Sequence, residues 1–155
     1  NDVNTENRGI IVTVPGMGRL DIPWEEFVKV TFYDHNINLP SYDYFKGSEP
    51  IRGTVTTVED RQYSGKLVYD LDEAFTLEVL NGRVELSEWQ IPFYNIAGIQ
   101  AKNYKYSKVS LKSGDELLIG KMQDVSEDND GILIFEGSGD PVYVPWEKIR
   151  KIRIE

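Results

Sequence analysis

Short stretches in which apolar and polar residues alternate run through most of the chain, and they predict β-strands. Val109 and Leu111 alternate with polar neighbours, a Ser-Gly-Asp turn follows at residues 113–115, and residues 116–122 return as a second strand. Residues 131–144 repeat this hairpin pattern around a glycine-rich turn. No stretch of ten residues sustains a period of 3.6, so we expect an all-β protein.

The same pattern recurs along the chain. Residues 2–33 align without a gap on residues 124–155, with 9 of 32 positions identical. Residues 90–99 carry a third copy of the end of this pattern: an aliphatic residue, Pro, a large aromatic residue, and aliphatic residues at three-residue intervals. Because Pro fixes φ and needs no N–H, this signature predicts a strand that ends at Pro, one helical turn, and a closing strand.

The repeats predict how the chain is organised. Residues 1–33 form the second half of a unit, residues 34–50 a joining loop, and residues 51–102 and 107–155 two complete units of five short strands. In the middle unit the strands are expected near residues 53–58, 63–69, 74–80, 88–91 and 97–100. The first unit lacks its opening hairpin, which we expect to lie upstream of Asn1; the alternative is strand addition from another chain.

The segment from Val109 to Gly114, followed by Gly120 and Asp124, resembles the first motif of Sm-like proteins and, more loosely, Src-homology-type barrels. This resemblance implies tandem small five-stranded barrels with short one-turn helices. Sm-like proteins also have an N-terminal helix, form rings of separate subunits and bind RNA, whereas this chain lacks such a helix pattern and holds its units in tandem. The whole sequence also resembles bacterial proteins without an assigned activity, for which export is expected.

Charge and composition narrow the function classes. The chain has 17 basic and 26 acidic residues, and its net charge of −9 disfavours nucleic acid as a partner. The absence of cysteine excludes disulfides and thiolate metal sites. No apolar run reaches the roughly 20 residues of a membrane span. Because the chain begins with Asn1 and not Met, we expect a periplasmic or secreted protein, with a cytoplasmic location as the alternative.

Two groups of aromatic residues are candidate contact residues. Tyr42, Tyr44 and Phe45 lie in the polar joining loop, where they either cap the junction between barrels or form a partner-binding patch. A second group consists of the large aromatic residue that follows Pro in each copy of the signature, and we expect these side chains to be buried in the core: Trp24, Phe93 and Trp146.

Acidic residues form the candidate polar sites. Asp70, Asp72 and Glu73 cluster in a turn, and paired carboxylates can hydrolyse glycosides when they face each other. Residues 126–131 alternate oxygen-bearing side chains before a glycine, as calcium loops do, but Gly137 stands where a bidentate Glu is needed. We therefore interpret residues 126–131 as an acidic turn.

No other motif indicates catalysis or a cofactor. His35 is the single histidine and lies beside Asp34, but no G-x-S-x-G motif accompanies it. We expect no metal, no cofactor and no catalytic residue. The predicted function is a non-catalytic binding or assembly module whose partner is a protein, either another copy or a different chain. The alternatives are a carboxylate-based hydrolase with a cleft between units and an Sm-like nucleic-acid binder.

Overall fold

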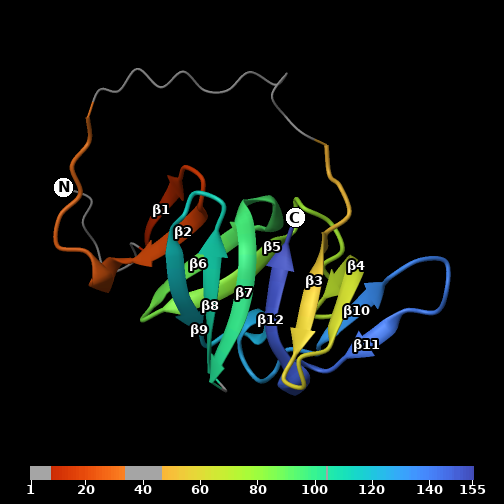
Figure 1. Ribbon diagram of the computed structural model, residues 1–155. Coiled ribbons are helices and arrows are strands. Elements are labelled where there is room, and N and C mark those ends of the chain that lie inside the picture. Colours follow the sequence, from red (N-terminus) through yellow and green to blue (C-terminus); the bar gives the residue numbers. More distant parts are fainter. Residues whose placement is uncertain (1–7, 34–46, 104) are drawn as a thin grey trace.

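The computed structural model describes residues 8–33, 47–103 and 105–155, and the expected all-β class is confirmed (Figure 1). In these residues the only helical elements are single 3-10 turns. The strands are β1 (Gly9–Val14), β2 (Gly18–Pro23), β3 (Arg52–Thr57), β4 (Gln62–Tyr69), β5 (Val79–Val84), β6 (Ser87–Pro92), β7 (Ile96–Asn103), β8 (Tyr106–Leu111), β9 (Glu116–Gly120), β10 (Ile132–Phe135), β11 (Val142–Val144) and β12 (Ile149–Ile154). The turns are η1 (Trp24–Glu26), η3 (Phe93–Asn95), η4 (Gln123–Val125) and η5 (Trp146–Lys148).

The strands form one open, 12-stranded sheet in the order β1-β2-β6-β5-β9-β8-β7-β12-β3-β4-β10-β11. Every pair of neighbouring strands is antiparallel. Strands β1 and β11 lie at the two ends of this order, on opposite sides of the molecule in Figure 1. Near the middle of the sheet β7 pairs with β12, and Ile99 lies opposite Ile152.

Strand pairing joins the two repeats. The hairpin β3–β4 comes from the middle repeat but lies between β12 and β10 of the last repeat. The hairpin β8–β9 comes from the last repeat but lies between β7 and β5 of the middle repeat. The groups β12-β3-β4-β10-β11 and β7-β8-β9-β5-β6 therefore have the same strand order. Each group combines the opening hairpin of one repeat with the last three strands of the other repeat.

The Pro-aromatic signature forms the same local structure in all three copies. Pro23, Pro92 and Pro145 stand at the N-terminal caps of η1, η3 and η5, with φ values of −68°, −59° and −67°. These values are those to which the proline ring restricts the backbone. After η3 and η5 the closing strands β7 and β12 begin at once, whereas residues 27–33 after η1 form no strand.

The core lies where the two repeats meet. Phe93 has no exposed surface and Trp146 is 6% exposed, as expected for core plugs. Their rings lie 5.3 Å and 6.0 Å from the ring of the buried Tyr69. Aliphatic side chains from both repeats complete this core, including Ile99 and Ile152. Because both repeats contribute to it, neither forms a separate core of its own.

One strand of the middle repeat lies further along the chain than predicted: β5 begins at Val79, not near residue 74. Asp70 and Leu71 adopt positive φ values of 50° and 66°, which turn the chain sharply after β4. The Glu78 carboxylate then accepts hydrogen bonds from the N–H groups of Ala74 and Phe75, at 2.5 Å and 2.8 Å. These contacts hold residues 70–78 as a loop.

Candidate functional site

Three segments of the sheet have the same order of elements: a hairpin, a 3-10 turn and a closing segment. We call residues 9–33 the first half-unit, and residues 79–103 and 132–154 the completed half-units. Each completed half-unit pairs with one opening hairpin, either β8–β9 or β3–β4. The closing strands β7 and β12 pair with β8 and β3, and the leading strands β5 and β10 pair with β9 and β4.

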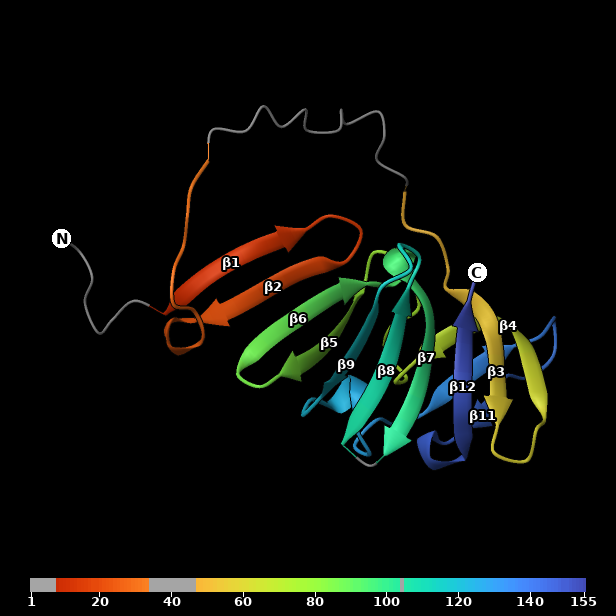
Figure 2. The ribbon, with the colours of Figure 1, turned by 60° about the vertical axis from the view of Figure 1, so that its left-hand side comes forward.

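The first half-unit has no opening hairpin among the described residues. Its strand β2 pairs with β6, while residues 10–14 of β1 pair with β2 and with no other described strand. Residues 27–33, which correspond to the closing strand β12, pair with no described strand. Figure 2 shows the orange chain after η1 leaving the sheet as a coil. In the first half-unit, the segment that corresponds to the closing strands of the other two half-units therefore forms no strand.

Burial differs sharply between equivalent positions. Val30 and Phe32 align with Ile152 and Ile154 in the repeat. Val30 is 36% exposed and Phe32 is 90% exposed, whereas Ile152 and Ile154 are 2% and 6% exposed. The expectation that Trp24 lies in the core is wrong: Trp24 is 37% exposed and packs edge-on against Phe27 at 5.0 Å. The first half-unit thus presents an apolar face that its equivalents bury.

Polar contacts attach the first half-unit to the sheet. The Glu26 carboxylate accepts hydrogen bonds from the Ser87 hydroxyl and, at 2.7 Å, from the Leu86 N–H. These two contacts, that of Ser87 foremost, lower the pKa of Glu26. The side-chain amide of Asn95 donates to the Met17 carbonyl oxygen at 3.1 Å. The hairpin β1–β2 is therefore held in place while its closing segment stays exposed.

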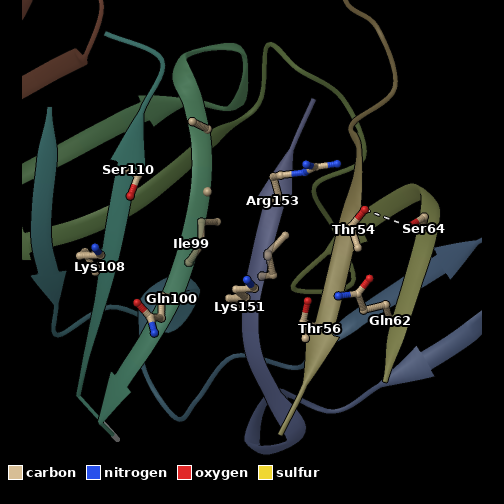
Figure 3. A pocket seen from close by; sticks show the side chains of 13 residues that line it. Thr54, Thr56, Gln62, Ser64, Ile99, Gln100, Lys108, Ser110, Lys151 and Arg153 are labelled. Carbon is tan, nitrogen blue, oxygen red and sulfur yellow. Dashed lines mark hydrogen bonds between the residues drawn. The ribbon is translucent and has the colours of Figure 1, made fainter. Parts of the chain in front are cut away.

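A polar groove of about 550 Å³ lies over the middle of the sheet (Figure 3). Strands β3, β4, β7, β8 and β12 line it with hydroxyl and amide side chains and with Lys108, Lys151 and Arg153. No acidic residue lines the groove, although the protein carries a net charge of −9. Lys108 pairs with Glu116 at 2.7 Å, while Lys151 and Arg153 form no ion pair with another described residue.

The predicted acidic cluster lies in the turn between β4 and β5, where the fold adds Asp124 to it. Burial raises the pKa of Asp70 to about 6, although the Asp130 N–H donates to its carboxylate. Burial, followed by the neighbouring carboxyl of Asp72, raises the pKa of Glu73 to about 9. The Oε2 atom of Glu73 is buried and has no hydrogen-bond partner. Burial also raises the pKa of Asp124.

The acidic loop before β10 is built as a turn. The Asn129 side chain donates to the Asp124 carbonyl oxygen at 3.0 Å and accepts from the Gly131 N–H at 2.8 Å. The Asp124 carboxylate accepts from the Asn81 N–H at 2.6 Å, which ties the loop to β5. Gly131 has a φ of 94°, a conformation that glycine adopts without strain. In the described residues no group of three His, Cys, Asp or Glu side chains is placed to hold a metal ion.

Some residues that were singled out from the sequence are not described by the structure. Tyr42, Tyr44, Phe45 and His35 lie outside the described residues. The exposed face of the first half-unit was not singled out from the sequence, because Phe32 aligns with Ile154 and has the pattern of a buried strand. Within the described parts of the chain there is no helix that is long and apolar enough to cross a membrane.

No known protein family, curated protein or solved structure matches this chain.

Proposed function

We propose that this protein is a non-catalytic binding module that takes up a protein partner on its first half-unit. The observation that carries the proposal is the difference in burial between Phe32, 90% exposed, and its equivalent Ile154, 6% exposed. An apolar strip beside the strand at the edge of a sheet is typical of surfaces that bind by strand addition. Main-chain hydrogen bonds would supply affinity, and the strip would supply side-chain contacts.

The five-stranded barrels expected from the sequence are part of this proposal. Each would draw its strands from two repeats, as the groups β12-β3-β4-β10-β11 and β7-β8-β9-β5-β6 do. A partner strand added to the first half-unit would extend the same arrangement to a third group. On this account the binding function is the completion of a repeated unit.

A selection from a displayed peptide library tests the proposal without assuming a partner. The wild-type chain is the target, and the Val30→Asp variant is the counter-target, because Val30 aligns with the buried Ile152. Val28→Asp is the matched control, since Val28 is fully exposed and aligns with the exposed Arg150. We expect apolar, alternating peptides that bind the wild type and Val28→Asp but not Val30→Asp. Peptides that bind all three proteins equally would contradict the proposal.

The groove supports a second candidate, the nucleic-acid binder. The supporting observation is that Lys108, Lys151 and Arg153 line it without any acidic neighbour in the lining. Cations on one face can contact phosphates, with an affinity that falls as salt rises. The test is fluorescence anisotropy of a labelled ten-nucleotide oligouridine at about 50 mM salt. Binding that is lost in Lys151→Glu/Arg153→Glu would support this candidate, and no binding by the wild type would remove it.

The hydrolase alternative gains no comparable support. Neither of the two described pockets is lined by Asp70, Asp72 or Glu73. We therefore do not carry this alternative forward.

A further inference from the structure

The polar groove over the middle of the sheet is built from two rows of residues that cross the strands (Figure 3). In the order of strand pairing, the first row consists of Ser64, Thr54, Arg153, Gly98 and Ser110. The second row lies on the same five strands and consists of Gln62, Thr56, Lys151, Gln100 and Lys108. These residues alternate with buried ones such as Val109 and Ile152, so they share the face of the sheet that points away from the core.

Two cations of the groove have no partner in the described part of the chain. Lys108 is neutralised by Glu116, whereas the exposed side chains of Lys151 and Arg153 form neither an ion pair nor a hydrogen bond with another described residue. In a protein with a net charge of −9, these cations make the groove locally positive. The groove is therefore complementary in charge to an anionic ligand.

A buried hydroxyl group of the same groove also lacks a partner. Thr56 is 2% exposed and lies opposite Lys151 in the strand register. Its hydroxyl forms no hydrogen bond with another described residue, although buried hydroxyl groups are usually hydrogen-bonded. By contrast, the hydroxyls of Thr54 and Ser64 bind each other at 2.9 Å. Thr56 can therefore donate to a ligand that reaches Lys151.

The spacing of the two cations fits an extended peptide. Lys151 and Arg153 are two residues apart on β12, so their Cα atoms lie about 6.6 Å apart. Side chains on one face of an extended peptide repeat at the same distance, so a peptide that runs along β12 can place alternate carboxylates over both cations. Single-stranded nucleic acid gains affinity from aromatic rings on which its bases stack, but no aromatic residue of the described chain lines the groove. The groove thus favours an acidic peptide over a nucleic acid.

We propose that this groove binds an extended acidic segment of a partner protein, which has carboxylates on alternate residues. The Arg153 guanidinium donates two parallel hydrogen bonds to one carboxylate, and the Lys151 ammonium and the Thr56 hydroxyl donate to the next. Gly98 adds no side chain beside Arg153, which leaves room for the peptide. No residue of the first half-unit lines the groove, so this site is separate from the one proposed there and goes beyond it.

The probe is a fluorescein-labelled peptide in which Glu and Thr alternate over about ten residues. The control peptide has the same number of Glu residues at every third position, so that successive carboxylates of the extended chain point to opposite faces. We expect fluorescence anisotropy at about 50 mM salt to show saturable binding of the alternating peptide and at least about fivefold weaker binding of the control peptide. Equal binding of the two peptides, or no binding of either, would overturn the proposal.

Single substitutions that each remove one positive charge test the residues. Lys151→Gln and Arg153→Gln are each expected to weaken binding of the alternating peptide by about fivefold. Lys66→Gln is the matched control, because Lys66 is exposed on β4 and does not line the groove; it is expected to change binding by less than about twofold. Equal effects of all three substitutions would mean attraction by overall charge alone and would overturn the proposal.

Amide chemical shifts measured by nuclear magnetic resonance locate the bound peptide. Changes centred on residues 98–100 and 151–153, with binding unaltered in Val30→Asp, support the groove. Changes confined to residues 27–33 would place the peptide on the first half-unit and overturn the proposal, while the proposed function would stand. Labelled oligouridine that binds more tightly than the alternating peptide, and loses this binding in Arg153→Gln, would overturn the proposal in favour of nucleic acid.

Discussion

The first half-unit and residues 132–154 have closely related sequences and the same local structure, but different surroundings. Both contain a hairpin, a proline and a 3-10 turn that begins with tryptophan. Of these two segments, only residues 132–154 have an opening hairpin from the described residues beside them, and only there does the closing segment form a strand, β12. The turn is thus encoded locally, whereas the closing strand requires a partner that is distant in sequence.

This difference has an energetic basis. The turn needs only a fixed proline φ and a neighbouring strand, and both copies provide them. The closing strand gains its stability from burial of apolar side chains and from ladder hydrogen bonds with another strand. Without that strand, residues 27–33 keep their backbone entropy and leave Phe32 in water. The same pattern therefore gives order in one place and a coil in the other.

The largest expected effect compares the two signature tryptophans. Trp146 is 6% exposed and packs against Tyr69, whereas Trp24 is 37% exposed. We expect Trp146→Ala to lower the free energy of unfolding by about 3–5 kcal/mol, and Trp24→Ala by about 1 kcal/mol or less. Urea unfolding followed by circular dichroism measures both values. Equal losses would mean that the first half-unit is packed like its equivalents.

The second expected effect is a dependence of the free energy of unfolding on pH, which arises from Asp70 and Glu73 in the acidic cluster. The folded pKa values of Asp70 and Glu73, about 6 and about 9, lie above their ordinary values of 3.8 and 4.5. At pH values between the ordinary pKa and the folded pKa of each carboxyl group, the folded state binds more protons than the unfolded state. The free energy of unfolding therefore falls as pH rises through this range. We expect a decrease on the order of 1–3 kcal/mol from pH 5 to pH 9.

Urea unfolding at several pH values checks this decrease. Glu73→Gln is expected to remove most of it between pH 6 and pH 9, because the amide cannot ionise. Glu26 and Glu116 have lowered pKa values and titrate below this window. A stability that rises from pH 5 to pH 9 would contradict the assignment.

The smallest expected effect concerns the closing segment itself. Val30→Ser is expected to change the free energy of unfolding by less than about 0.5 kcal/mol, because exposed positions away from special contacts rarely contribute more. Ile152→Ser at the equivalent buried position is expected to cost about 2–5 kcal/mol. Thermal and urea unfolding of the pair measure the contrast. A large loss in Val30→Ser would indicate that residues 27–33 are already paired in the free chain.

Much of the fold could be predicted from the sequence because its signals are local. Alternation indicated the hairpins, and the Pro-aromatic signature indicated the turns at Trp24, Phe93 and Trp146. The start of β5 was misplaced because Asp70 and Leu71 adopt positive φ without being glycine, which no simple pattern reveals. The pairing of β3–β4 with the last repeat was also hidden, because similar strands fit either repeat equally well.

The candidate sites were harder to predict for a related reason. The acidic cluster was visible in the sequence, but Asp124 joins it only through the pairing between repeats. The groove that Lys108, Lys151 and Arg153 line could not be predicted, because it depends on the contact of β7 with β12. The exposure of Phe32 could not be predicted, because its sequence pattern is that of a buried strand.

Amide hydrogen exchange tests most directly the central claim, which is that residues 27–33 are exposed and pair with no described strand, whereas the equivalent strands β7 and β12 are paired. The account predicts fast exchange in residues 28–33 alongside slow exchange in β7 and β12, and slower exchange in residues 28–33 once a peptide selected from the library is bound. Slow exchange in residues 28–33 of the free chain, or fast exchange there that the bound peptide leaves unchanged, would contradict the claim.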